Sequence, residues 1–128
     1  MTLDKNRKKE LASTYTQTFR PMGVYQLRNV RNGKVYVDGS MDLPGTLNRF
    51  NFCKQMNNCL HHEIKQDWAT FGPEAFVFEE LDQIKPREEL AGDPAAAKQY
   101  REEVDALLEL WLEKLEPYGD KGYNKLKR

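Results

Sequence analysis

One hairpin signal constrains the fold of this chain more than any other feature of its sequence. β-Branched and aromatic residues recur over 22–29 and again over 34–38, and the dipeptide Asn32-Gly33 lies between the two runs. Asn and Gly tolerate the positive φ of a tight turn, so the pattern predicts two antiparallel strands joined there. We therefore expect a fold built around a sheet that starts from a local hairpin.

Two helices are predicted after the hairpin. Asp42 can cap a helix that begins near Pro44 and runs to about residue 56, where two asparagines break it. Apolar residues at spacings of four predict a second helix over about 59–71, which Gly72 and the proline after it end.

A third strand and a long helix complete the predicted elements. Residues 75–81 have the composition of a strand, and an apolar stripe at helical spacing predicts a helix over about 94–116, which Pro117 stops. Helices and strands do not alternate regularly in this order. An α+β fold is therefore predicted rather than a parallel α/β sheet.

A length of 128 residues suits one domain with its own core. We assign residues 1–21 to a polar N-terminal arm or short helix and residues 22–128 to a single domain. No apolar run is long enough to span a bilayer, and no apolar stretch follows the basic N-terminus. We therefore expect a cytoplasmic protein with reduced cysteines.

Charge is distributed unevenly, although the formal net charge is zero. Residues 1–66 contain 11 Lys and Arg against 5 Asp and Glu, whereas residues 67–120 contain 5 against 15. A basic front half suits a polyanionic partner. Zero net charge therefore does not exclude nucleic acid as a partner.

Five short motifs occur in an order that resembles the GIY-YIG nuclease superfamily, especially its homing-endonuclease type. They are Gly23-Val24-Tyr25, Tyr36-Val37, Trp68 to Gly72, Phe76 to Glu79, and Gly122-Tyr123-Asn124. The resemblance covers about residues 22–124 and implies a three-stranded antiparallel sheet flanked by helices. It also implies cleavage of phosphodiester bonds in DNA with one divalent metal ion, Mg²⁺ or Mn²⁺.

The resemblance also implies roles for individual residues. Tyr25 and Tyr36 match the two motif tyrosines, and Asn124 matches the terminal asparagine. Arg49 is the candidate for the arginine that neutralises the phosphate, and Glu109 is the candidate metal ligand. A tyrosine acts as a general base only where a cation lowers its pKa from about 10. The structural alternatives are sheet packing for the tyrosines, surface charge for Arg49 and strand pairing for Asn124.

Three positions depart from the motif. Asp38 stands where the second motif has glycine, unless Gly39 is that glycine displaced by one residue; either way, a carboxylate lies close to the expected phosphate. An ungapped comparison puts Thr46 at the arginine position, with Arg49 three residues later on about the same helix face. Phe50 falls where many relatives have histidine.

The metal position is open between two neighbouring residues. Counting back from Asn124 selects Glu109, whereas counting back from Trp111 selects Leu108, which cannot bind metal. One residue corresponds to about 100° of helix rotation. Leu108 belongs to the apolar stripe, so we expect Glu109 to point away from the core. The alternative for Glu109 is a solvated acidic row that it forms with Asp and Glu residues four positions away.

Basic side chains on the hairpin and near the C-terminus are candidates for contacts with phosphates. They are Arg28, Lys34, Lys121, Lys125 and Arg128, with ordinary surface charge as the alternative.

Two cysteines and two histidines raise the question of a zinc site. The spacing of Cys53, Cys59, His61 and His62 matches no common structural zinc pattern, and adjacent histidines on a helix point about 100° apart. No zinc is therefore expected.

Three functions remain open from the sequence. The first is a metal-dependent DNA endonuclease, which ranks slightly ahead because the fold signal is complete. The second is a catalytically degraded domain of the same type that binds nucleic acid without cutting, and salt-sensitive binding without a metal-dependent product would indicate it. The third is a protein-interaction module that uses the acidic late helix.

Overall fold

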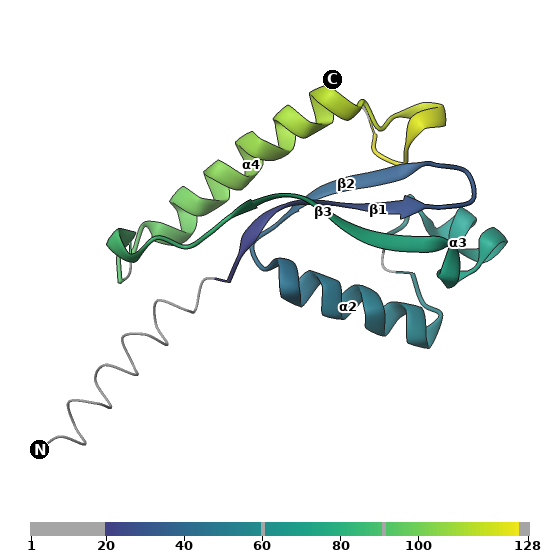
Figure 1. Ribbon diagram of the computed structural model, residues 1–128, viewed down its shortest axis with the longest axis horizontal. Coiled ribbons are helices and arrows are strands. Elements are labelled where there is room, and N and C mark those ends of the chain that lie inside the picture. Colours follow the sequence, from purple (N-terminus) through teal and green to yellow (C-terminus); the bar gives the residue numbers. More distant parts are fainter. Residues whose placement is uncertain (1–19, 60, 91, 126–128) are drawn as a thin grey trace, which may run out of the picture.

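A three-stranded antiparallel sheet forms the middle layer of the fold, with helices on both of its faces (Figure 1). The computed structural model describes residues 20–59, 61–90 and 92–125, so most of the predicted N-terminal arm lies outside the described residues. Strands β1 (Met22–Asn29), β2 (Val35–Ser40) and β3 (Phe76–Ile84) lie in the order β2-β1-β3. The predicted α+β class and three-stranded sheet are confirmed.

Helices α2 (Leu43–Met56) and α3 (Lys65–Phe71) cover one face of the sheet, and α4 (Ala96–Leu115) covers the other (Figure 1). The prediction for the middle helix was wrong at its start, because residues 61–64 form a turn in which the Ile64 amide donates to the His61 carbonyl at 3.1 Å. No helix in the described part of the chain is long and apolar enough to cross a membrane.

Local backbone and cap interactions fix the hairpin and the helix after it. The Asn29 amide donates to the Lys34 carbonyl at 2.9 Å, and Gly33 has a φ of 79°. The connection covers residues 30–34, which is longer than a two-residue turn. The Asp42 carboxylate accepts from the Gly45 amide at 3.0 Å and caps α2, as the sequence predicts.

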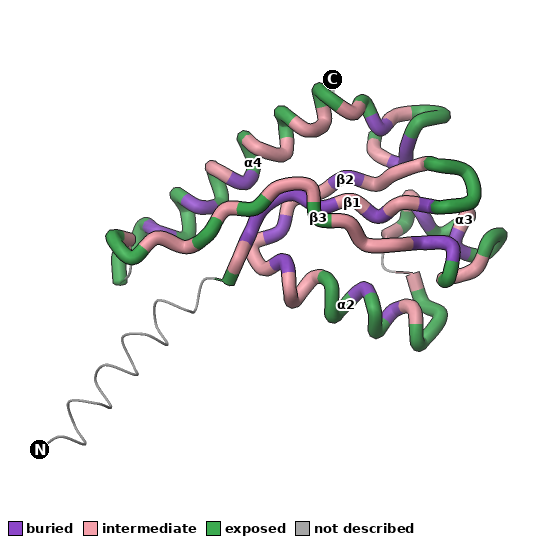
Figure 2. Tube along the Cα trace, viewed as in Figure 1, coloured by how far each residue is buried: buried purple, intermediate pink, exposed green. Residues whose placement is uncertain are grey.

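The sheet separates two apolar cores, which appear as buried positions on both sides of the strands (Figure 2). Under α2 and α3, the core is built mainly from large aromatic and aliphatic side chains, including Phe50, Trp68 and Phe76. Under α4, a smaller core contains Met22 and Val104. The larger core therefore lies on the face that carries the motif tyrosine of β1.

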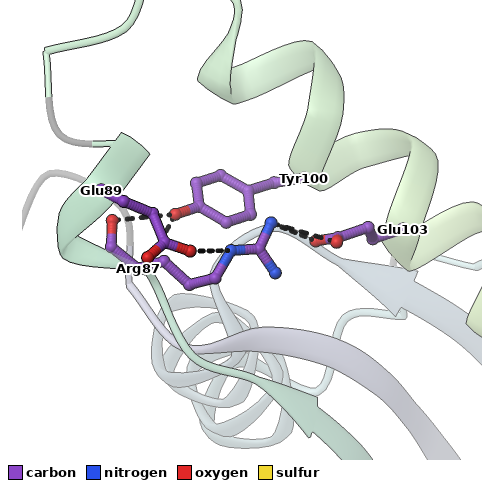
Figure 3. A network of polar contacts seen from close by, with 4 residues as sticks. All are labelled: Arg87, Glu89, Tyr100 and Glu103. Carbon is purple, nitrogen blue, oxygen red and sulfur yellow. Dashed lines mark hydrogen bonds and ion pairs between the residues drawn. The ribbon is translucent and has the colours of Figure 1, made fainter.

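A polar network fastens the N-terminal part of α4 to the segment that follows β3 (Figure 3). The Arg87 guanidinium lies 3.1 Å from a Glu103 carboxylate oxygen and 3.7 Å from one of Glu89. The Arg87 amide donates to the Tyr100 hydroxyl at 2.7 Å. These contacts fix the position of the start of α4. They also help to fix the direction of the helix, whose C-terminal half lies against β2.

Candidate functional site

The hairpin register puts the motif side chains on the sheet face that α2 covers. It pairs Tyr25 with Asp38 and Leu27 with Tyr36. Tyr25 and Leu27 belong to the core under α2, and Tyr36 packs against that core. Because side chains alternate along a strand, the two tyrosines are diagonal neighbours on one face, and Asp38 lies beside both.

A first cavity, which we call the apolar cavity, lies between this face and α2 and has a volume of about 460 Å³. Aromatic, aliphatic and thiol groups make most of its wall. Its polar lining residues are Asp38, Thr46, Arg49 and His61. Tyr25 lines it as well and stacks on Phe78 with ring centres 5.0 Å apart. The cavity therefore brings the predicted residues Tyr25 and Arg49 together.

A second cavity, which we call the acidic groove, lies between β2 and the C-terminal half of α4 and has a volume of about 720 Å³. Its acidic lining residues are Asp38, Glu63, Glu109, Glu113 and Glu116. Lys125 is the one cation among its lining residues. The groove contains the predicted residues Tyr36, Glu109 and Asn124. Asp38 lines both cavities, so the predicted site is divided into two halves that meet at β2.

The contact between α4 and β2 separates the roles of Leu108 and Glu109. A Cβ on Gly39 would lie 2.8 Å from Val104 Cγ1 and 3.8 Å from Leu108 Cδ2, so α4 approaches the strand closely at Gly39. Leu108 is half-buried at this contact, whereas Glu109 is exposed. Both line the acidic groove, and Glu109 is the one that can offer a carboxylate there.

The Asn124 side chain pairs with the backbone of β2. Its Oδ1 accepts from the Val37 amide at 2.8 Å, and its Nδ2 donates to the Val37 carbonyl at 2.7 Å. The Tyr123 amide also donates to the Val35 carbonyl at 2.9 Å. These bonds cover the outer edge of β2 as a neighbouring strand would. The side-chain amide of Asn124 therefore stabilises the backbone of β2 next to Tyr36.

Both motif tyrosines are held in their neutral form. Burial raises the pKa of Tyr25, the charges of Asp38 and Tyr36 add to the shift, and Arg49 opposes it. Burial, followed by the charges of Asp38 and Glu63, raises the pKa of Tyr36 to about 12. A general base must be deprotonated near the working pH, so these surroundings suit the two hydroxyls to donate hydrogen bonds rather than to accept a proton.

The turn before α3 contributes two groups that the motif comparison did not identify. The His61 ring lies against Tyr36, with ring centres 4.6 Å apart and planes inclined by 35°. Burial lowers the pKa of His61, opposed by Asp38 and Glu63, so the imidazole is neutral at pH 7. Glu63 lines the acidic groove. Neither residue belongs to a motif of the resemblance. Both lie in the turn that replaces the predicted start of the helix.

The thiols and imidazoles considered for zinc are divided by exposure. Cys53, Cys59 and His61 line the apolar cavity, whereas His62 is exposed and is not among its lining residues. The Cys59 thiol donates to the His61 carbonyl at 3.2 Å. Over residues 20–59, 61–90 and 92–125, no group of three His, Cys, Asp or Glu side chains is arranged to hold a metal ion.

Three of the predicted phosphate contacts lie elsewhere or are paired. Arg28 forms an ion pair with Glu79 at 2.7 Å, and Lys34 Nζ lies 5.5 Å from the centre of the Tyr123 ring. Lys121 lies 3.6 Å from a Glu116 carboxylate oxygen. Neither Arg28 nor Lys34 lines either cavity, whereas Lys125 lines the acidic groove. Arg128 lies outside the described residues.

The other two departures from the motif are structural. The Thr46 hydroxyl lies 2.7 Å from the Ser40 hydroxyl and links α2 to the end of β2. Phe50 is buried and meets Trp68 edge to face, with ring centres 6.3 Å apart. Arg49, beside Phe50, is exposed and lines the apolar cavity. On α2, Arg49 is therefore the charged group available to a phosphate.

The donor set of the acidic groove fits a hard divalent cation. Its acidic residues and the Tyr36 hydroxyl offer oxygen atoms, and the thiols lie in the other cavity. Mg²⁺ commonly takes one or two carboxylates, keeps several waters and completes its shell with a substrate phosphate. Glu109, Asp38 and Glu63 line the groove and are the residues that could supply such carboxylates.

Comparisons with known proteins show a likeness in structure. No protein-family model and no curated protein matches the chain. The catalytic domain of the homing endonuclease I-TevI matches with a TM-score of 0.57 and 20% identity, over 83% of this chain and 99% of that domain. A mutant of the same intron endonuclease domain matches with a TM-score of 0.55 and 20% identity, over 81% and 92%. The chain has the fold of a GIY-YIG homing-endonuclease catalytic domain.

Proposed function

We propose that this chain is an endonuclease-like domain that hydrolyses phosphodiester bonds in DNA and depends on Mg²⁺ or Mn²⁺. The observation that carries the proposal is the position of β2 between the two cavities. Asp38 lines both, with Arg49 on one side and Glu109 on the other. A phosphate at β2 would thus have a cationic side chain and a metal-binding carboxylate within one site. The likeness to the I-TevI catalytic domain supports the same conclusion.

The chain's own groups divide the work of hydrolysis. Arg49 neutralises the phosphate through its planar donor fork. Tyr25 and Tyr36 donate hydrogen bonds to phosphate oxygens, since the pKa of each is raised. Asp38 lies beside both tyrosines and is our candidate to accept the proton of the attacking water as its oxygen bonds to phosphorus and the P–O bond to the leaving strand breaks.

Glu109, with a second oxygen ligand from the acidic groove, would hold the divalent cation. When bound, the cation neutralises charge on the phosphate and on the leaving oxygen. The groove otherwise repels DNA, because its acidic residues outnumber Lys125.

A second function has a specific observation in its favour. Asp38 lies at or next to the position of the motif glycine, and its charge adds to the burial that raises the pKa of both tyrosines. A carboxylate there opposes phosphate docking and general-base catalysis. The alternative is a domain that binds nucleic acid or a protein partner without cutting. Without a bound cation, the carboxylate at β2 would limit the domain to contacts that avoid the groove.

A cleavage assay separates the two functions. Purified protein is incubated with single-stranded and double-stranded DNA in Mg²⁺, in Mn²⁺ and in chelator, beside the variants Glu109→Gln and Tyr36→Phe. Glu102→Gln is the matched control, because Glu102 is exposed on the same helix and is not among the groove's lining residues. We expect metal-dependent cutting that is slower in Tyr36→Phe, that needs a higher metal concentration in Glu109→Gln, and that is unchanged in the control. A folded protein that binds DNA in a salt-sensitive way but forms no product in any condition favours the non-cutting function.

A further inference from the structure

Apart from Tyr25, Asp38 and Arg49, the residues that line the apolar cavity have no part in the proposed hydrolysis. Tyr25, Phe50 and Trp68 line it together with aliphatic and thiol groups. Its volume of about 460 Å³ lies within the usual range of small-molecule sites, about 300–1,000 Å³. Cleavage of a phosphodiester needs charge and water, which such walls do not supply. Their composition indicates an occupant that is flat and largely apolar.

The polar groups of the cavity are few and chemically distinct. The Asp38 carboxylate has two acceptor oxygens, of which Oδ1 accepts from the Gly39 amide at 2.8 Å. The neutral His61 ring offers one N–H donor and one acceptor. Arg49 is exposed, and no carboxylate among the described residues forms an ion pair with it. Its guanidinium is thus available to a phosphate at the cavity mouth.

We propose that the apolar cavity holds one nucleobase of the DNA, turned out of its strand, with the adjoining phosphate on Arg49. The inference rests on the proposed function, because the nucleotide belongs to the proposed substrate. Aromatic side chains stack on any base, and nucleic-acid enzymes bind out-turned bases in pockets of this kind. Since Asp38 lines both cavities, a base in the apolar cavity brings its phosphate to the acidic groove.

Asp38 predicts which bases the cavity favours. A carboxylate accepts hydrogen bonds from the exocyclic amino groups of adenine, cytosine and guanine. Thymine has no amino group, and carbonyl oxygens flank its one ring N–H, so a carboxylate repels it in most orientations. We therefore expect the cavity to prefer the three bases that carry an amino group.

Two tryptophans allow a direct test by ¹H–¹⁵N NMR. The chain contains only Trp68, which lines the cavity, and Trp111 on α4, which does not. The four deoxynucleoside 5′-monophosphates and deoxyribose 5-phosphate are titrated in chelator, and Trp111→Phe assigns the indole signals. We expect a saturable shift of the Trp68 indole with dAMP, dCMP and dGMP, about tenfold weaker binding of dTMP, and no shift with the sugar phosphate. Bound nucleotide should also protect the half-buried Cys59 thiol from an alkylating reagent, which gives a second readout.

Variants sharpen the outcomes. Asp38→Asn should bring dTMP binding to within about threefold of the other nucleotides, because an amide both donates and accepts. Asp105→Asn, on an exposed face of α4, should leave the preference unchanged. Equal binding of all four nucleotides to the wild-type protein overturns the role of Asp38. An unchanged Trp68 indole signal together with an unprotected Cys59 thiol overturns the base site.

The test is independent of cleavage, so the two proposals fail separately. Nucleotide binding at Trp68 without cutting of any DNA supports the base site and contradicts the proposed nuclease function. The opposite result would be DNA cutting with no shift of the Trp68 indole, at a rate that does not change when each base next to the cut is removed in turn. This result supports the nuclease function and contradicts the base site.

Discussion

The two cavities on either side of β2 share a strand and one aspartate but differ in chemistry. The apolar cavity has aromatic walls and one arginine, whereas the acidic groove has five acidic residues and one lysine. The first can hold a flat apolar group without help. The second can hold an anion only after it has bound a cation.

Under the proposed function, this difference separates base binding from the metal-dependent step. The apolar cavity is part of the larger core, so its shape depends on packing that also stabilises the fold. The acidic groove lies under the exposed C-terminal half of α4 and depends on surface charges. Substitutions in the cavity should therefore affect stability and binding together, whereas substitutions of the exposed carboxylates of the groove should affect metal-dependent steps alone.

The largest effect should come from the wall of the apolar cavity. Trp68→Ala should lower the free energy of unfolding by about 3–5 kcal/mol, because Trp68 is 6% exposed and packs on Phe50 and Phe76. Trp111→Ala should cost less, since Trp111 is only partly buried on α4. Urea unfolding of both variants measures the difference. Equal losses would mean that the two helical layers contribute equally to the free energy of unfolding, which would contradict the difference between the two regions.

The next effect concerns how each side responds to metal. Arg49→Gln should lower the cleavage rate about 100-fold at every Mg²⁺ concentration, because it removes a fixed charge from the phosphate site. Glu109→Gln should instead raise the Mg²⁺ concentration needed for half-maximal rate, because it removes a metal ligand. Initial rates across a Mg²⁺ series distinguish them. If saturating Mg²⁺ restores the cleavage rate of Arg49→Gln to that of the wild-type protein, the assignment of the cation and the arginine to separate cavities is wrong.

A smaller effect is expected at the edge of β2. Asn124→Ala should lower the free energy of unfolding by about 1–3 kcal/mol, because it leaves the amide and carbonyl of Val37 without their side-chain partner. Asn58→Ala is the control, since Asn58 is exposed. Chemical denaturation measures both. A loss for Asn124→Ala no larger than the control would show that the bonds to β2 contribute nothing to stability.

The smallest effect concerns alkaline pH. Tyr36 has a pKa of 10 in the unfolded state and about 12 in the folded state. Between pH 10 and pH 12, the folded state therefore binds more protons than the unfolded state. Tyr36 should therefore contribute stability below pH 10 that is lost as pH rises toward 12. Asp38→Asn should lower the folded pKa of Tyr36 only in part, because burial is the larger cause. Absorbance titration of the phenolate in Asp38→Asn and in wild-type protein measures this shift; an unchanged titration would mean that Asp38 does not act on Tyr36.

Elements whose causes are local could be predicted from the sequence. The hairpin follows from β-branched strands around Gly33, and α2 follows from the cap at Asp42, because turn and cap residues act within a few positions. The long helix α4 follows from its apolar stripe. The resemblance also identified Tyr25, Tyr36 and Glu109 as residues to follow.

Tertiary structure alone decided how those residues are grouped. Only the strand register puts Asp38 across from Tyr25. Only the approach of α4 at Gly39 turns Leu108 toward the sheet and leaves Glu109 at the groove. The division into an apolar cavity and an acidic groove depends on contacts between segments far apart in the chain. Pattern and propensity describe neighbours in sequence, so they cannot determine which face of one element meets which face of another.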